Sequence, residues 1–165
     1  MRNKIFIMMV FALLFTQFAA AAEDWKGESP KHEMTAGGMA GLGILGGSAG
    51  VAIMGSVAKK IVNRGFVSDI NDQVFVEVAA GPLFISGSTV FVYSTHLRWD
   101  FYRDEVLAPY AIGGLGGHVT GAALGSTWAL FPRFGAGVLW KVAQMFSVRA
   151  EVSHEFTGAG VQVAF

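Results

Sequence analysis

Residues 90–101 read VFVYSTHLRWDF, and the alternation in this stretch decides the fold. Apolar side chains recur at every second position, which is the period of a β-strand and not of a helix. One face of this strand carries Phe91, Tyr93, Thr95, Leu97, Trp99 and Phe101. The other face carries Val92, Ser94, His96, Arg98 and Asp100. The first face has aromatic residues at both ends, as a strand in contact with lipid does, and the second is too polar for hydrocarbon. The pattern predicts a membrane-spanning strand with its polar face toward a lumen.

The same alternation occurs in residues 74–80, 134–142, 146–156 and 161–165. In residues 146–156 we expect every second side chain from Phe146 to Phe156 to face outward. Glycines weaken the pattern in residues 108–119, where Tyr110 and Ile112 fit an outward face. Residues typical of turns separate these stretches. The expected turns are Ser86-Gly87-Ser88, Thr120-Gly121, Ala143-Gln144 and Thr157-Gly158.

Residues 37–58 carry no charge and allow two interpretations. Small residues four apart, as at Gly43 and Gly47, are typical of a packed membrane helix. Eight glycines weaken such a helix, and Gly46-Gly47-Ser48 falls where a hairpin turn would lie. We therefore predict two strands, Ala36 to Leu45 and Ala49 to Ile61. The total becomes eight, and an even count is what a single-chain bacterial barrel needs. The predicted fold class is all-β, a closed antiparallel transmembrane β-barrel of eight strands.

The first 22 residues have the design of a secretory signal peptide. Arg2 and Lys4 precede an apolar run, and Ala20-Ala21-Ala22 supplies small residues for cleavage. The alternative is an uncleaved membrane anchor. We expect a signal peptide over 1–22, a short polar periplasmic segment over 23–35 and the barrel over 36–165.

Composition excludes several classes of protein. Without the first 22 residues the chain keeps ten basic and twelve acidic residues, a net charge near −2 with no basic stripe, so no nucleic-acid partner is expected. There is no cysteine, hence no disulfide and no thiolate metal site. Charged residues make up only 15% of the chain, which suits an outer surface that faces lipid.

The last third of the chain resembles the small eight-stranded outer-membrane β-barrels of the OmpA-like and OmpW-like type. The resemblance is carried by PYAIGGLGG at 109–117, FGAGVLW at 134–140, FSVRAEV at 146–152 and the terminal Phe165. It implies a location in the cell outer membrane, with contacts to outer-membrane lipid and lipopolysaccharide, and a monomeric state. It also implies that Val161, Val163 and Phe165 form the signal that the barrel-assembly machinery reads.

The inward faces predict a cluster of charges rather than a catalytic site. An eight-stranded barrel is narrow enough for side chains to fill it, and charges inside it need partners. We predict a lumen ion-pair network of six residues: Glu77, Arg98, Lys141, Arg149, Glu151 and Glu155. No cofactor or metal site is expected. His118 and His154 are expected at the membrane interface.

A structural or envelope-integrity role follows as the predicted function, and the protein is not expected to be an enzyme. One alternative is a narrow channel for small or apolar solutes, because glycines leave some room inside. A second is a lipid A-modifying enzyme that uses Ser153, His154 and Glu155. Adjacent strand residues point to opposite faces, so His154 does not easily reach Ser153, which argues against catalysis.

Overall fold

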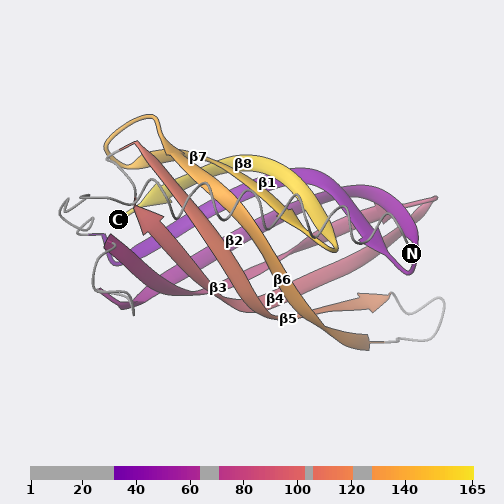
Figure 1. Ribbon diagram of the computed structural model, residues 1–165. Coiled ribbons are helices and arrows are strands. Elements are labelled where there is room, and N and C mark those ends of the chain that lie inside the picture. Colours follow the sequence, from indigo (N-terminus) through magenta and orange to yellow (C-terminus); the bar gives the residue numbers. More distant parts are fainter. Residues whose placement is uncertain (1–31, 64–70, 103–105, 121–127) are drawn as a thin grey trace, which may run out of the picture.

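The computed structural model describes residues 32–63, 71–102, 106–120 and 128–165, which form eight β-strands (Figure 1). The predicted signal peptide, most of the polar segment over 23–35, and Gly121 of one predicted turn lie outside the described residues. The strands are β1 Met34–Leu45, β2 Ser48–Val62, β3 Asn71–Ile85, β4 Ser88–Tyr102, β5 Leu107–Thr120, β6 Trp128–Lys141, β7 Phe146–Ser153 and β8 Phe156–Ala164.

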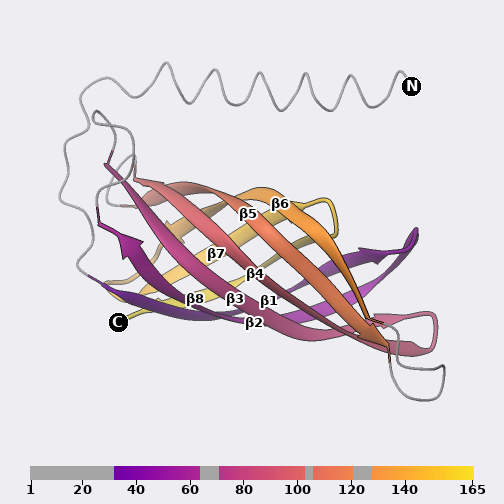
Figure 2. The ribbon, with the colours of Figure 1, turned by 90° about the horizontal axis from the view of Figure 1, so that it is seen from below.

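Each strand pairs antiparallel with its neighbours in sequence, and β1 also pairs with β8, so the sheet closes into a barrel. At the seam the backbones of Met34 and Phe165 exchange two hydrogen bonds of 2.9 Å. Following paired residues once around the barrel leads from Trp140 to Leu130 on the same strand, a stagger of ten residues. A stagger of this kind requires strands that tilt against the barrel axis, as Figure 2 shows. The predicted closed eight-stranded barrel is confirmed.

The interpretation of residues 37–58 as two strands is confirmed, and the turn falls at Gly46-Gly47. These glycines have φ of 58° and 82°, and Ser86-Gly87 between β3 and β4 has φ of 42° and 80°. Two successive positive φ values define the hairpin turn whose twist matches that of the flanking strands. Strand β1 begins at Met34, two residues before the expected start.

We call the end of the barrel that carries the β1–β2, β3–β4 and β7–β8 turns the turn end, and the opposite end the termini end. Among the described residues no helix is long and apolar enough to cross a membrane.

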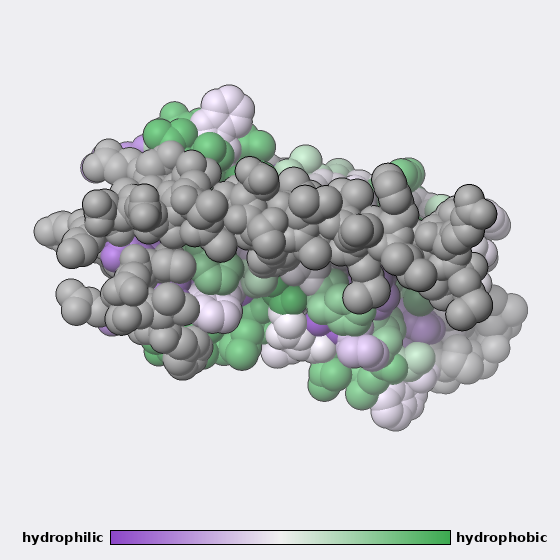
Figure 3. All heavy atoms as spheres, viewed as in Figure 1, coloured by the Kyte–Doolittle hydropathy of each residue, from purple (hydrophilic) through white to green (hydrophobic). Residues whose placement is uncertain are grey.

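The outward face of the barrel is almost free of charge. Along the described strands, the outward positions include two charged residues, Lys59 and Asp72, and both lie in the half nearer the termini end. Large apolar side chains occupy much of the remainder, with Leu97, Phe134 and Val161 each about half exposed. Figure 3 shows hydrophobic side chains gathered on the parts of one face that are not grey. An uncharged exterior of this kind suits contact with lipid.

The inward and outward faces of strand β5 are the reverse of our prediction. Tyr110 and Ile112 are 2% and 5% exposed and point into the lumen. Tyr110 pairs with the inward residues Asp100 and Gly137. The glycines of this strand carry no side chains, so the sequence pattern rested on two residues that are apolar enough for either face.

The β7–β8 turn also differs from the prediction. Strand β7 ends at Ser153, His154 and Glu155 form the turn, and Phe156 begins β8. The expected turn at Thr157-Gly158 is wrong, because these residues pair with β1 inside β8. Phe156 faces the lumen at 4% exposure. Because the turn has two residues, the inward positions are odd-numbered in β7 and even-numbered in β8. The sequence did not reveal this change, because the lumen is apolar at this end and an inward Phe156 resembles a residue that faces lipid.

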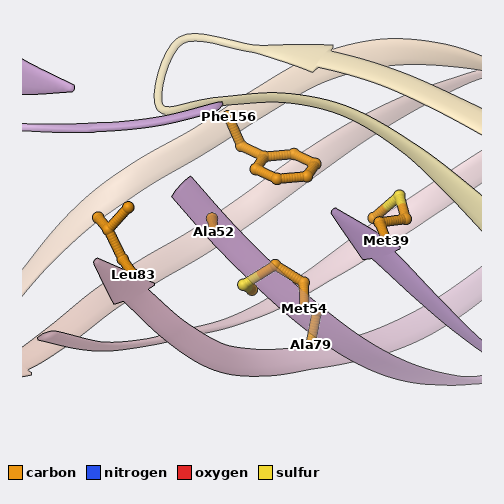
Figure 4. Packing of buried hydrophobic residues seen from close by; sticks show 6 residues of the cluster. All are labelled: Met39, Ala52, Met54, Ala79, Leu83 and Phe156. Carbon is orange, nitrogen blue, oxygen red and sulfur yellow. The ribbon is translucent and has the colours of Figure 1, made fainter. Parts of the chain in front are cut away.

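The buried apolar residues of the interior form two clusters. At the turn end an apolar cluster contains Met39, Ala52, Met54, Ala79, Leu83 and Phe156. Figure 4 shows side chains of this cluster directed into one interior space from several strands. Toward the termini end, a smaller cluster contains Ala108, Tyr110, Ile112 and Leu139. Buried charged side chains lie beside this smaller cluster, since Ile112 pairs with Arg98 and Leu139 pairs with Arg149 in the sheet.

Arginine in place of Leu97 tests which face of β4 meets lipid. Leu97 is 49% exposed on the outward face near the middle of the barrel. We expect Leu97→Arg to lower the free energy of unfolding by about 2–4 kcal/mol, the cost of a cation near the bilayer midplane. The measurement is reversible denaturation in lipid vesicles. Leu107→Arg is the control, because Leu107 is also outward but begins β5 at the barrel end, where the cost falls to about 1 kcal/mol or less. Equal losses in the two variants would contradict the proposed depth of Leu97.

Candidate functional site: an ion-pair chain in the lumen

Glu77 lies at the centre of the buried charges. Its two carboxylate oxygens accept hydrogen bonds from two arginines: Arg98 Nη1 at 2.6 Å and Arg149 Nη1 at 2.7 Å. The three residues come from β3, β4 and β7, and each is at most 1% exposed. One carboxylate therefore joins walls of the barrel that are far apart in sequence.

The chain of ion pairs continues from Arg98 toward the termini end. Arg98 Nε and Nη2 donate to the two oxygens of Asp100 at 2.8 Å and 3.1 Å, a two-pronged pairing that fixes the plane of the guanidinium. Arg98 Nη1 also donates to Gln162 Oε1 of β8 at 2.9 Å. The face of Phe75 lies 4.6 Å from the guanidinium carbon and completes the enclosure of this cation.

Toward the turn end the chain runs through Arg149 and Arg133. Arg149 Nη2 donates to Glu151 Oε2 at 2.6 Å, and Glu151 Oε1 accepts from Arg133 Nη2. Arg133 Nη1 lies 3.2 Å from Glu155 Oε1. Glu155 Oε2 in turn lies 2.8 Å from His154 Nδ1, in the β7–β8 turn. Acidic and basic groups thus alternate without a break from Asp100 to His154.

Tyr110 holds the middle of this chain in place. Its hydroxyl accepts a hydrogen bond from Arg149 Nε at 2.9 Å and lies 3.1 Å from both Glu151 Oε2 and the carbonyl oxygen of Ala150. The ring packs over Gly137, where an added Cβ would collide with the ring and its hydroxyl. A glycine opposite an inward aromatic residue therefore makes room for the tyrosine.

Four of the six residues predicted for the network belong to it directly: Glu77, Arg98, Arg149 and Glu151. Glu155 lies in a turn rather than on a strand and reaches the others through Arg133. The structure corrects the prediction that Lys141 belongs to the network. It is the last residue of β6 and is exposed at the termini end, and among the described residues no ion pair joins it to the network.

Sequence reasoning left out Asp100, Tyr110, Arg133 and Gln162. In the alternation, Asp100 and Gln162 fall on the faces opposite lipid. The sequence therefore indicates that they point inward, although it does not indicate which residues they bind. Arg133 precedes the predicted start of its strand at Phe134, whereas β6 begins at Trp128. Extending the same alternation back by one residue would have turned Arg133 inward.

Ser153, His154 and Glu155 do not form a catalytic arrangement in this geometry. The Ser153 hydroxyl donates to the carbonyl oxygen of Phe156 at 3.1 Å and accepts from its N–H at 3.0 Å, so it closes the turn. His154 faces Glu155 and stacks on Phe134, with ring centroids 4.8 Å apart. The part of the chain that the structure describes has no group of three or more histidine or acidic residues placed to hold a metal ion.

No family model matches the sequence, and no curated protein matches it significantly. Solved structures do match. The N-terminal β-barrel domain of Pseudomonas aeruginosa OprF has 15% sequence identity and a TM-score of 0.61 over 82% of this chain and 100% of that chain. A designed transmembrane β-barrel has 15% identity and a TM-score of 0.55 over 82% and 97% of the two chains.

Ail, the attachment invasion locus protein of Yersinia pestis, was solved with the heparin analogue sucrose octasulfate. It has 14% identity and a TM-score of 0.52 over 81% of this chain and 97% of that chain. These likenesses show the fold. The chain has the fold of the small eight-stranded outer-membrane β-barrels, and the resemblance drawn from the sequence is confirmed at that level.

Neutralising Glu77 tests the importance of the ion-pair chain. Glu77→Gln keeps the shape of the side chain but leaves Arg98 and Arg149 each with one negative partner fewer. We expect a loss of about 3–5 kcal/mol in the free energy of unfolding, the usual result of breaking a fully buried pair. Lys141→Gln removes a charge outside the network and should change the stability by less than about 0.5 kcal/mol. If both variants unfold at the same denaturant concentration as the parent, the lumen is wet enough to screen its charges.

Proposed function

We propose that this protein is an integral outer-membrane β-barrel with a structural or envelope-integrity role, and that its lumen does not conduct. The observation that carries this proposal is the unbroken ion-pair chain from Asp100 to His154. In a barrel as narrow as this one, side chains from the wall are long enough to meet in the middle. Here the arginines do so, and each is bound by acids from other strands or from its own.

The two apolar clusters support a closed lumen. Met54, Leu83 and Phe156 fill the turn end, and Ile112 and Leu139 pack beside the charges, where they pair with Arg98 and Arg149 in the sheet. An ion would have to displace several hydrogen-bonded charges and then cross an apolar zone, and both steps are costly. The alternative of a narrow channel is therefore less well supported than a closed barrel.

The three described turns at the turn end are too short to form a large adhesive surface by themselves. Three connections there have two residues each: Gly46-Gly47, Ser86-Gly87 and His154-Glu155. Stable interfaces usually need some 20–30 residues on each partner, which these turns do not supply. The closed sheet also leaves no edge strand for a second copy, which supports a monomer surrounded by phospholipid and lipopolysaccharide. We propose no catalytic role, because the Ser153 hydroxyl is already occupied in the turn.

Conductance measurements test the closed lumen. We expect the refolded parent protein to show no steady ion conductance in planar lipid bilayers, because the ion-pair chain fills the cross-section. Folding and insertion are verified in the same sample by the shift in gel mobility on heating. Steady single-channel steps from the parent protein, with ion selectivity altered in Glu77→Gln, would overturn the proposal in favour of a channel.

Deleting the last residue tests location and assembly together. Val161, Val163 and Phe165 lie on one face at the end of the chain, and Phe165 is 54% exposed. We propose that this face is the signal read by the barrel-assembly machinery and that the termini end faces the periplasm. The parent protein should fractionate with the outer membrane in heat-modifiable form. Deletion of Phe165 should leave export intact but reduce the folded fraction several-fold. Ala164→Gly, which alters the neighbouring inward position, is the control. Normal insertion of the truncated chain would refute the assembly signal, and recovery of the parent protein in the soluble periplasm would refute the location.

A further inference from the structure

The β7–β8 hairpin is much shorter than the rest of the barrel wall. Strand β7 has 8 residues and β8 has 9, whereas β2, β3 and β4 have 15 each. At the termini end Ser147 still pairs with Lys141, the last residue of β6, and Ala164 pairs with the second residue of β1. The missing length therefore lies at the turn end. Figures 1 and 2 both show the β7–β8 turn stopping short of the other described turns.

The pairing around the barrel gives the level of this turn on the opposite wall. Paired residues lead from Thr157, the second residue of β8, to Thr89 of β4 in one direction and to Trp99 of β4 in the other. Because β4 is equally many strands away in both directions, the level of Thr157 lies midway between these two residues, next to Thr95 in the middle of β4. From that level β4 continues to Ser88, roughly five residues further than β8 does, which is about 12 Å along the axis of a barrel with tilted strands.

Above the β7–β8 turn, one side of β6 has no described strand beside it. Strand β6 pairs with β5 from its first residue, but its pairing with β7 begins only at Gly135. No whole strand is left as an edge, yet the backbone of residues 128–134 lacks a strand partner on its β7 side among the described residues. Hydrocarbon offers no partner to backbone N–H and C=O groups, so this side of β6 needs water or polar headgroups beside it.

A further strand does not fit this gap. The Lys141 N–H donates to Val106 on the β5 side at 2.8 Å, so the even-numbered residues of β6 point toward the β7 side. Pro132 is one of them, and it has no N–H with which to continue a ladder. Prolines at an open edge are a usual protection against pairing with another chain. The gap therefore suits small polar groups and not a second copy of the sheet.

Polar side chains mark the level of the turn on the outer surface. The His154 side chain is 39% exposed and stacks on the outward ring of Phe134. Its Nδ1 lies 2.8 Å from Glu155. Thr157, one residue beyond the start of β8, is outward and exposed. Such groups are costly in hydrocarbon, although their level is close to the middle of β4.

The opposite wall is apolar up to its turn. Phe84 and Phe91 are outward, lie near the β3–β4 turn and are 45% and 52% exposed. Hydrocarbon is therefore expected almost to the top of β3 and β4, but only to the β7–β8 turn on the other side of the barrel.

We propose that the leaflet at the turn end is thinned beside β7 and β8, and that lipid headgroups with their water fill the space above the β7–β8 turn. The inference rests on the membrane insertion proposed above. A bilayer adapts to a short wall by thinning locally, at a modest cost for each ångström. The low wall of the barrel is thus an interaction surface for lipid headgroups. They contact His154 and the open side of residues 128–134, whereas β3 and β4 meet a leaflet of full thickness.

Two threonines at the same level provide a matched test. The chain has no cysteine, so Thr157→Cys and Thr95→Cys each carry a single spin label. Both residues are outward and exposed, but Thr157 is on the low wall and Thr95 is on the high wall. The labelled proteins are folded in vesicles of dioleoyl-phosphatidylcholine. Electron paramagnetic resonance then measures the accessibility of each label to oxygen, which concentrates in hydrocarbon, and to a water-soluble nickel complex.

We expect the nickel-to-oxygen accessibility ratio at position 157 to exceed that at position 95 by at least about fivefold, because about 12 Å of wall is missing above it. Leu97→Cys, labelled in the same way, reports insertion, since Leu97 is outward near the middle of the barrel. Its label should be open to oxygen and closed to nickel. In vesicles of dilauroyl-phosphatidylcholine, whose hydrocarbon layer is thinner, the difference between positions 157 and 95 should shrink.

Three results would overturn the proposal. Equal ratios at positions 157 and 95, with the label at position 97 in hydrocarbon, would mean that an inserted barrel lies in a leaflet of even thickness. A difference that stays the same in the thinner bilayer would place the water in a local gap of the protein and not in a thinned leaflet. A label at position 97 that is open to nickel would contradict membrane insertion itself, and the inference with it.

Discussion

The buried carboxylate of Glu77 is the interaction on which the rest of this barrel depends. It binds two arginines that come from β4 and β7, and it does so at full burial. Removing charges from water costs several kcal/mol for each ion, and only close pairing offsets that cost. Once the outward face is almost free of charge, the inward face must supply every partner. The lumen is therefore arranged as an alternating chain in which most members have at least two neighbours of opposite charge.

This chain also explains the distribution of aromatic residues and glycines inside the barrel. Phe75 and Tyr110 lie against guanidinium groups, with their ring centroids 4.6 Å from Arg98 and 4.9 Å from Arg149. Such rings attract cations and shield them from water. Tyr110 occupies that place because Gly137 offers no side chain beside it. The inward glycines thus make room for the large side chains that the charges require, and do not by themselves imply an open pore.

The two ends of the lumen are chemically different. The turn end is lined mostly by the apolar side chains around Met54, Leu83 and Phe156, whereas nearer the termini end Ile112 and Leu139 pack beside the charges of Arg98 and Arg149.

The sequence by itself determined the closed eight-stranded barrel, the orientation of β4 and the inward direction of Glu77, Arg98, Arg149 and Glu151. The physical reason is that a strand alternates its faces strictly, so charges on one face and aromatic residues on the other leave one orientation in lipid. Only the tertiary structure decided the orientation of Tyr110, the place of the β7–β8 turn and the exclusion of Lys141. Glycines give no alternation to read, an apolar zone inside the lumen makes Phe156 look like a residue that faces lipid, and the end of a strand lies beyond the reach of the buried network. The pairing of particular charges also depends on the stagger around the closed sheet, which brings together residues as far apart as Glu77 and Arg149 and which no single strand encodes.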